Sequence, residues 1–537
     1  MKYIFVTGGV ISSVGKGLTA ASIGALLESR GFRVKLQKFD PYLNVDPGNM
    51  NPLQHGEVYV LKDGGETDLD LGHYERFTNT NLTRKNSLTS GQVYTTVLDK
   101  ERKGVYAGVT VQVIPHITDE IKSRIRENSN DCDVLITEIG GTTGDIEGLP
   151  FLEAIREFAL EQPFGSVIFI HVTLVPYISA VRELKTKPTQ HSVAKLREIG
   201  ITPNIIICRC EHPLNKELRK KISLFCNVPY EAVIEEKDVE HSIYELPLVL
   251  QRENLDTLIC KLLQLEQRPS DMTKWQDVVR SIIAPSSSIR VGLVGKNVGV
   301  NDAHKSLQEA LFHACIANDT RLKVVRIDPE ELETSGSHLL EKIDAILVPG
   351  ASGVREVEGK ILAAKYAREH HIPFLGICLG MQAVIIEYAR NVLGLKTAHS
   401  AEFDSATEYP VIIPLENTLS TNAQPASHKQ RRHIHLGARD CKLKSGSKAR
   451  AIYAQEQISE RHRNSYVFNN KYRELFEKEG NLLFSGLSTV DSLVELVELK
   501  GHPFFMSCQF HPEFQSKPHS PHPLFKEFIA AALAAKK

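Results

Sequence analysis

A short apolar strand that runs directly into a glycine- and serine-rich turn constrains the fold of this chain more than any other feature. Residues 2–7 (KYIFVT) have the pattern of a buried parallel strand, and the turn GGVISSVGKG leads into an apolar-periodic segment at 18–29. This order predicts a strand, a loop and a helix. Further strands with helical patterns between them are expected at 33–37, 133–138, 167–172 and 204–208, so the first half is predicted to be α/β.

A second α/β region is predicted after a polar stretch that ends in proline and three serines. It contains expected strands at 289–294, 344–348 and 373–377, helices at 303–316 and from Leu379, and a terminal helix. The fold class is therefore α/β with two domains, each built on a mostly parallel sheet flanked by helices. The predicted bounds are 1–266 for the first domain, 267–288 for a linker and 289–537 for the second domain.

The composition of the chain limits the kinds of partner that it is expected to bind. The net charge of -1 over 537 residues supplies no extended field for a nucleic-acid backbone, so we expect small anions held at local sites and no nucleic acid. The nine cysteines are odd in number and lack C-x-x-C spacing, which argues against a disulfide framework or structural zinc and favours the cytoplasm. Apolar runs are too short for a membrane span, so no membrane partner is expected.

The first turn predicts a phosphate-binding loop. It joins a strand to a helix, so backbone N–H groups and the helix dipole point at an anion, and Lys16 adds a positive charge. The spacing departs from the strict Walker pattern, and an ordinary glycine turn is the alternative. Asp70 and Glu138, the latter at a strand end, are the expected Mg²⁺ carboxylates against ATP phosphates.

A second turn predicts a nucleophile. Gly376-Ile377-Cys378-Leu379-Gly380 follows an apolar strand and precedes a helical pattern, which is the G-x-S-x-G elbow with cysteine in the serine position. His511 and Glu513 follow a later strand, so the histidine can take the thiol proton while the carboxylate orients its ring. Cys378, His511 and Glu513 form a triad hypothesis, for which inert core cysteine and a structural histidine are the alternatives.

These motifs resemble two known families. GICLGMQ followed by QFHPEF resembles class I glutamine amidotransferases over about 289–534. FVTGGVISSVGKG, GGETDLDLGHYERF, TEIGGTTGDIEGLPF and KTKPTQHSV resemble the P-loop-like amidoligase domain of the CTP synthase family. The resemblance implies ATP-dependent amination of UTP to CTP with ammonia from glutamine. It also implies the cofactor Mg²⁺, CTP as inhibitor, GTP as activator and a homotetramer, with Lys305 at a position near the domain junction.

The resemblance also implies binding residues. Those for ATP are Ser13, Val14, Gly15, Lys16, Gly17, Leu18, Asp70, Lys237, Asp238 and Val239, and those for the metal are Asp70 and Glu138. Those for UTP and CTP are Ser12, Asp145, Ile146, Glu147, Lys185, Thr186, Lys187, Pro188, Thr189, Gln190 and Lys221. Those for glutamine are Ala351, Leu379, Gly380, Met381, Gln382, Glu402 and Ser465, and an ammonia gate falls at Pro52, His55 and Val58.

Two departures from the family pattern concern glutamine. The usual P-G-G-F-G is Pro349-Gly350-Ala351-Ser352-Gly353 here, and the usual R-H-R-H-R-Y is RHRNSY at 461–466. If a side chain at Ser465 is needed, we expect weaker glutamine affinity. The rival functions are an amidoligase acting on a carboxylate, which KTKPTQ argues against, and a nonenzymatic nucleotide switch or filament scaffold, in which an intact triad would have no use.

Overall fold

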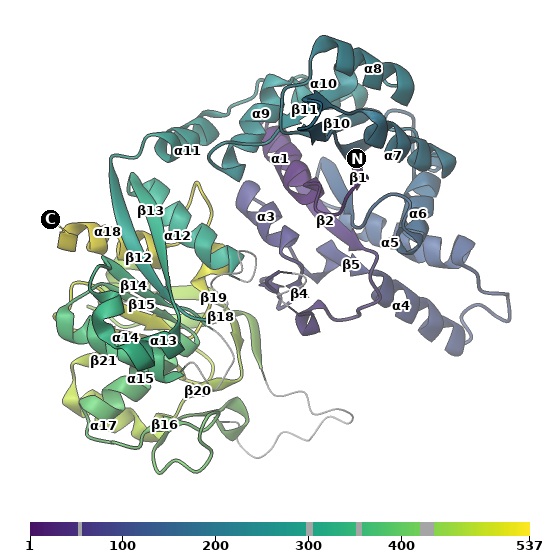
Figure 1. The fold of residues 1–537 in the computed structure, drawn as a ribbon. Helices are drawn as coiled ribbons and strands as arrows, with labels where there is room; N and C mark the ends of the chain where they lie inside the picture. Colours follow the sequence, from purple (N-terminus) through teal and green to yellow (C-terminus); the bar gives the residue numbers. More distant parts are fainter. Residues whose placement is uncertain (52–55, 297–303, 351–356, 419–433, 537) are drawn as a thin grey trace. The chain divides into compact units, whose positions relative to one another are not determined.

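The computed structural model describes residues 1–51, 56–296, 304–350, 357–418 and 434–536. Contacts divide the chain into two compact units (Figure 1). The first unit contains Met1–Met50 and Thr67–Ile283, and the second contains Asn51–Glu66 and Ala284–Lys537. Each unit has its own sheet and its own buried core.

The first unit is built on a sheet of seven strands in the order β11-β10-β7-β1-β6-β2-β5, and its pairs are parallel. Its central strand carries fully buried Ile4, Phe5 and Val6, which is the expected composition of a strand covered on both faces. The strands are β1 Lys2–Gly8, β2 Val34–Asp40, β5 Ser87–Thr89, β6 Val134–Ile139, β7 Val167–Leu174, β10 Ile205–Cys210 and β11 Val233–Lys237.

Helices connect these parallel strands, because a parallel pair needs a long crossover. The connecting helices are α1 Lys16–Ser29, α3 Asp70–Phe77, α4 Ser90–Arg102, α5 Thr118–Asn128, α6 Leu149–Leu160, α7 Lys187–Glu198 and α8 Lys216–Cys226. Three more helices follow the last strand of the sheet, namely α9 Leu246–Arg252, α10 Leu255–Leu262 and α11 Thr273–Ile283. The last of these lies inside the segment expected to be a linker, and its Trp275 packs on Phe77 with ring centroids 5.2 Å apart.

The second unit has a sheet of nine strands in the order β13-β12-β14-β15-β23-β22-β21-β18-β19. The strands are β12 Ser287–Val294, β13 Thr320–Ile327, β14 Ala345–Val348, β15 Phe374–Ile377, β18 His435–Leu443, β19 Gln457–Asn464, β21 Leu482–Ser488, β22 Val494–Leu499 and β23 Phe505–Cys508. Pairing is parallel from β13 to β23 and antiparallel from β23 to β19.

The helices of the second unit are α12 Lys305–Ala317, α13 Pro329–Ser335, α14 Val357–His370, α15 Leu379–Asn391, α16 Lys448–Tyr453, α17 Arg473–Glu479 and α18 Pro523–Lys536. A small sheet contains β16 His399–Ser400, β17 Pro410–Pro414 and β20 Tyr466–Phe468. The α/β class and the named strands and helices are confirmed. The antiparallel half was not foreseen, because its strands lie in the long stretch between Leu379 and the final strand, for which no elements were predicted.

A short segment from the first half of the sequence belongs to the second unit. Residues 51–66 include β3 Tyr59–Val60, which pairs with β4 Glu66–Thr67. The Glu57 carboxylate accepts the Ser306 N–H at the start of α12 (2.9 Å), and the Lys62 carbonyl accepts the Ala438 N–H (2.8 Å). The predicted domain bounds stay a prediction, and this segment is where sequence order and spatial grouping differ.

In the stretches that the structure describes, a search of the helices found none with the length and apolar character needed to cross a membrane.

Candidate active site

The turn between β15 and α15 holds Cys378 in a tightly packed position. Its φ of 53° lies in the left-handed region, which a residue with a β-carbon occupies only at a cost. A β-carbon on Gly376 would lie 2.8 Å from the Gly380 backbone, and one on Gly380 would lie 2.3 Å from the Val348 carbonyl oxygen. Packing therefore requires both glycines. The Cys378 side chain is half-buried, whereas the other cysteines are buried.

His511 and Glu513 follow β23, the strand beside β15. His511 Nδ1 lies 2.7 Å from Glu513 Oε1. Burial lowers the pKa of His511, but the Glu513 carboxylate and a hydrogen bond with Cys378 outweigh burial and raise this pKa to about 10. The three predicted triad side chains therefore come together, and the histidine is held as a cation beside the sulfur.

Gly350 lies against the same pair. A β-carbon there would be 3.0 Å from His511 Cε1 and 3.1 Å from Cys378 Cβ, so the backbone approaches both side chains closely. Gly350 is the second residue of the segment 349–353, which departs from the family's usual P-G-G-F-G. Ala351, Ser352 and Gly353 lie outside the described residues, as do Pro52 and His55 of the expected ammonia gate.

The other residues expected to bind glutamine differ in their burial and in their bonding. The side chain of Met381 is fully buried in the core, so only its backbone is available to a ligand there, and Gly380 packs on β14. Gln382 Nε2 donates to the Tyr466 carbonyl (3.4 Å), next to Ser465. The Ser465 carbonyl accepts the Leu415 N–H (2.8 Å), and Glu402 is half-buried.

Tyr59 and Arg461 hold the turn that carries the triad. The Tyr59 hydroxyl donates to the Phe514 carbonyl (2.7 Å), and the Phe514 ring stacks on the His511 ring at 5.5 Å. Arg461 Nη1 donates to the Tyr59 hydroxyl (3.2 Å), and its carbonyl accepts the His511 N–H (2.8 Å). Sequence reasoning did not foresee this contact, because Tyr59 is over 450 positions from His511 and Glu513 and no local pattern marks it.

The first turn of the first unit has the strained backbone of an anion-binding loop. Val10, Ser13 and Gly15 have φ of 78°, 58° and 103°. Lys16 Nζ donates to the Gly141 carbonyl (2.7 Å), and burial lowers the pKa of this lysine. Arg209, which was not predicted, donates to the carbonyls of Ser13 and Val14 (both 3.3 Å). The loop is thus clamped from the end of β10.

Carboxylates gather beside this loop. A β-carbon on Gly17 would lie 2.3 Å from Asp70 Oδ1, so the glycine makes room for that carboxylate at the start of α1. Lys38 Nζ bonds Asp70 (2.5 Å) and Asp68 (2.9 Å). Burial alone would raise the pKa of Asp70, but the Lys38 ammonium lowers it to about 2.

Glu138 accepts a hydrogen bond from the Tyr74 hydroxyl. Burial, with the nearby Asp70 charge, raises the pKa of Glu138 to about 7. No group of three His, Cys, Asp or Glu side chains in the described ranges is arranged to hold a metal ion. The Asp70 and Glu138 pair still fits Mg²⁺, which takes one or two carboxylates and completes its shell with phosphates and water.

A cavity of about 80 Å³ brings together residues expected at ATP. Its lining includes Gly15 and Leu18 from the first turn and Lys237, Asp238 and Val239 after β11. Arg209 Nε donates to Asp238 Oδ1 (2.9 Å), and so ties the two segments to each other. The apolar part of the lining, Ile243 and Leu246, was not predicted.

A cavity of about 720 Å³ brings together part of the expected pyrimidine nucleotide site. Lys185, Thr186, Lys187 and Lys221 line it, together with Tyr177, Arg182 and His212, which were not predicted. Four cationic side chains around one cavity suit a polyphosphate. Arg182, Lys185 and Lys187 follow β7, and Lys221 lies in α8, which follows β10, so all four come after the carboxyl end of a strand, where ligands of a parallel sheet are expected.

The remaining expected nucleotide residues do not line that cavity. Thr189 is fully buried, with its hydroxyl 3.2 Å from the Leu174 carbonyl, and Gln190 Nε2 donates to Thr186 (3.1 Å). Pro188 lies in the first turn of α7. Ser12, Asp145, Ile146 and Glu147 are exposed, and the last two lie in a short 3-10 helix, Ile146–Gly148. The Asp145 carboxylate accepts the Thr142 N–H (3.0 Å), which keeps the loop after β6 in place.

Comparison with known proteins gives consistent results. Residues 2–265 match the family described as CTP synthase N-terminus, and residues 299–531 match the glutamine amidotransferase class-I family. A CTP synthase of Trichlorobacter lovleyi is 54% identical over 534 residues, 99% of this chain and 98% of that protein. One of Caldanaerobacter subterraneus subsp. tengcongensis is 54% identical over 538 residues, 100% and 99% respectively. The glutaminase domain of Trypanosoma brucei CTPS with bound acivicin is 35% identical, covers 46% of this chain and 94% of that chain, and has a TM-score of 0.41.

Proposed function

The chain belongs to the CTP synthase family and therefore converts UTP to CTP with ATP and with nitrogen taken from glutamine, and we propose that it divides this reaction between two sites, one in each unit. Family membership sets aside the amidoligase acting on a carboxylate and the nonenzymatic scaffold. The second unit releases ammonia, and the first unit transfers it to the nucleotide.

Cys378, His511 and Glu513 release ammonia from glutamine. The Cys378 thiolate attacks the side-chain amide carbon, and the His511 imidazolium gives its proton to the departing nitrogen, so that ammonia and a thioester form. Water then attacks the thioester and returns the thiol with release of glutamate. Glu513 orients the ring and stabilises the imidazolium. The 2.7 Å contact between His511 and Glu513, with the cysteine beside them, is the observation that carries this assignment.

Glutamine binds around the start of α15. Backbone groups of Leu379, Gly380 and Met381 face the amide, and Gln382, Glu402 and Ser465, with Ala351, complete the site. The buried side chain of Met381 supports a role for the backbone at that position. If the contact at Ser465 is also made by the backbone, the departure from the family's usual residue there leaves activity intact.

The first unit carries out the ligation. ATP phosphorylates the oxygen at position 4 of the UTP ring, and ammonia displaces the phosphate to give CTP. Lys16 and the backbone of Ser13 to Leu18 bind the ATP phosphates, and Lys237, Asp238 and Val239 bind the rest of ATP, which the small cavity supports. Asp70 and Glu138 hold Mg²⁺, which when bound neutralises charge on the phosphates.

UTP binds at the larger cavity, with Lys185, Lys187 and Lys221 on its triphosphate. Ser12, Thr186, Pro188, Thr189 and Gln190 complete the site, Thr189 by holding α7 in place. CTP inhibits by sharing the triphosphate contacts, while Asp145, Ile146 and Glu147 read its base or ribose. The exposed carboxylates of that loop support this role.

Activation by GTP, assembly as a homotetramer and work in the cytoplasm complete the proposal, and they are supported by the family resemblance. An absorbance assay tests the reaction. UTP, ATP, Mg²⁺ and the protein are mixed with glutamine or with ammonium, and the change from a uracil to a cytosine spectrum is followed. We expect CTP with either nitrogen source and none without ATP. CTP formation with ammonium but not with glutamine would contradict the assignment of a working glutaminase.

A further inference from the structure

We propose that Gln509 is a further catalytic residue of the glutaminase, in which its side-chain amide donates a hydrogen bond to the Cys378 sulfur and favours the thiolate. This inference rests on the proposed role of Cys378 as the nucleophile. Gln509 Nε2 lies 3.6 Å from Cys378 Sγ, which is within hydrogen-bond range for sulfur. Together with His511, it gives the sulfur a second N–H donor.

Strand register places Gln509 beside the cysteine. The parallel pair β15 and β23 sets Ile377 opposite Cys508, and the Cys508 carbonyl accepts the Cys378 N–H at 2.7 Å. The next residue on each strand is therefore Cys378 on one side and Gln509 on the other. On its far side, the Gln509 N–H donates to the Glu495 carbonyl at 2.9 Å. The backbone of Gln509 is thus fixed from both neighbouring strands.

The burial of Gln509 is difficult to explain by stability alone. Its side chain is 1% exposed. A side-chain amide has two N–H donors and an oxygen with two lone pairs, yet Gln509 Oε1 has no hydrogen-bond partner in the part of the chain that the structure describes. Burying an incompletely bonded amide costs free energy, whereas an apolar side chain of the same length would not carry that cost. The contact with the sulfur supplies a reason for a polar group here.

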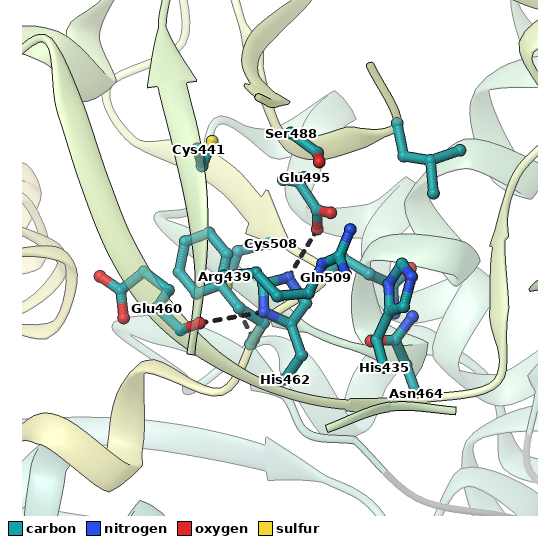
Figure 2. Close-up of polar contacts among 12 residues, drawn as sticks. His435, Arg439, Cys441, Glu460, His462, Asn464, Ser488, Glu495, Cys508 and Gln509 are labelled. Carbon is teal, nitrogen blue, oxygen red and sulfur yellow. Dashed lines mark hydrogen bonds and ion pairs between the residues drawn. The ribbon is translucent and has the colours of Figure 1, made fainter. Parts of the chain in front are cut away.

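A buried pair supports this placement (Figure 2). His462 Nε2 lies 2.8 Å from Glu495 Oε2, and His462 Nδ1 lies 3.0 Å from the Glu460 carbonyl oxygen. His462 and Glu495 are 0% and 1% exposed. Both ring nitrogens therefore face oxygen atoms, and the histidine holds the Glu495 side chain to β19. Because the Glu495 carbonyl also accepts the Gln509 N–H, Glu495 and His462 act as positioning residues for the amide.

The hydrogen bond from Gln509 to the sulfur would act at two steps of the reaction. Before attack, a donor at the sulfur stabilises negative charge there and so raises the fraction of thiolate at neutral pH. When water breaks the thioester, the same donor stabilises the departing thiolate. A hydrogen bond to a charged group changes such equilibria by about 10- to 100-fold.

The test measures the thiol directly. The full-length protein is treated with iodoacetamide between pH 5 and 10, and alkylation of the Cys378 peptide is timed by mass spectrometry. Gln509→Met keeps the length of the side chain but removes the donor, and Gln509→Glu keeps its shape but adds a repelling charge. We expect the midpoint of the pH profile to rise by about one pH unit or more in Gln509→Met and further in Gln509→Glu. Glutamine-dependent CTP formation should fall about 10-fold or more in both.

Two controls separate this role from a structural one. Gln457→Met removes a side-chain amide on β19, the edge strand of the same sheet, that bonds Asp440 (3.1 Å), and should leave the midpoint unchanged. Glu495→Gln should move the midpoint in the same direction by a smaller amount. A purely structural effect would lower the alkylation rate equally at every pH. An unchanged midpoint in both Gln509 variants overturns the proposal, whatever happens to turnover.

Failure of the underlying assignment gives a different result. If complete alkylation of Cys378 in the parent protein left glutamine-dependent CTP formation intact, Cys378 would not be the nucleophile, and Gln509 would lose its proposed role with it. A parent enzyme inactivated in step with alkylation, and Gln509 variants with the parent's midpoint, would reject only the inference on Gln509.

Discussion

The two sites of this chain differ in how their charges are balanced. In the second unit, the reacting groups bond one another, with Cys378, His511 and Glu513 in sequence. In the first unit, Lys38 is bonded to Asp68 and Asp70, and the lysines of the large cavity surround an open volume. Unpaired charges are costly to bury, so a site built for polyphosphates keeps its cations paired or exposed until the ligand binds. We therefore expect the proposed ligase site to gain its counter-charges when its substrates bind, whereas the proposed triad already contains its own.

The largest expected effect separates the two sites completely. Cys378→Ala should lower glutamine-dependent CTP formation by about 10⁴-fold or more, because the nucleophile is lost. Ammonia-dependent formation should stay within about twofold, because the thiol takes no part in ligation. Initial rates with each nitrogen source measure both. Cys315→Ala, at a buried cysteine of α12, is the matched control and should spare both rates. Equal loss with both sources in Cys378→Ala would mean that Cys378 is structural.

The next largest effect should appear with both nitrogen sources. Lys16→Ala, Asp70→Asn and Glu138→Gln should each lower CTP formation by about 10²- to 10³-fold with glutamine and with ammonia, because ATP is needed for both. Asp133→Asn removes a half-buried carboxylate of the same unit that pairs with the exposed Arg33 (2.8 Å) and should change little. A variant with normal ammonia-driven turnover would remove its residue from the site.

A smaller effect tests the interaction between His511 and Glu513 through the pH dependence of stability. The pKa of His511 is raised from 6.5 to about 10 in the folded protein. Its contribution to stability is therefore fully present below pH 6.5 and is lost as pH rises toward 10. Glu513→Gln removes the main raising charge, so the melting temperature should depend less on pH across this window, by at least about 2 °C. Calorimetry at pH 6 and pH 10 measures the difference, and parallel curves for parent and variant would reject it.

The smallest effect lies within the nucleotide region. Glu147→Ala should raise the CTP inhibition constant about 10-fold while changing the KM for UTP little, because only the product uses that carboxylate. Lys187→Ala should weaken both, because both nucleotides share the triphosphate contacts. Glu198→Ala, which removes an exposed partner of Lys195 on α7 (2.8 Å), is the control. Noncompetitive inhibition by CTP in the parent, or an unchanged inhibition constant in Glu147→Ala, would defeat the shared-site proposal.

Sequence reasoning predicted the local structure of the candidate sites where the pattern lies in neighbouring residues. The elbow around Cys378, the turn before α1 and the His511-Pro512-Glu513 run each follow a strand, as the patterns indicated, and their catalytic and binding roles stay predictions. Arg209, Lys38 and Tyr59 were missed because each acts on a segment far away along the chain. A lysine inside an apolar strand and a tyrosine after a glycine loop have many structural explanations, and only the folded contacts select among them.

The same limit explains the antiparallel half of the second sheet. Strands β18, β19 and β22 carry charged residues, and some of these are buried. Arg461 donates to the Val60 carbonyl, and the Glu495 carboxylate bonds His462. Alternation of apolar and polar residues is therefore weak there, and the period that normally indicates a strand is obscured. The partners of β18 are also distant, because it pairs with β19 and β21 through residues 15 to 47 positions apart, so no short hairpin turn marks these pairings.

Residues 51–66 have a practical meaning for anyone who divides this protein into parts. A fragment that begins at residue 284 would contain Cys378, His511 and Glu513 but would lack Tyr59, whose hydroxyl bonds the Phe514 carbonyl just after them. In a chimera whose two halves were joined within 267–288, the residue in the place of Tyr59 would come from the other protein. The genetic unit that can be exchanged between relatives is therefore the whole chain, or a carboxyl-terminal half supplied with its own copy of the segment 51–66.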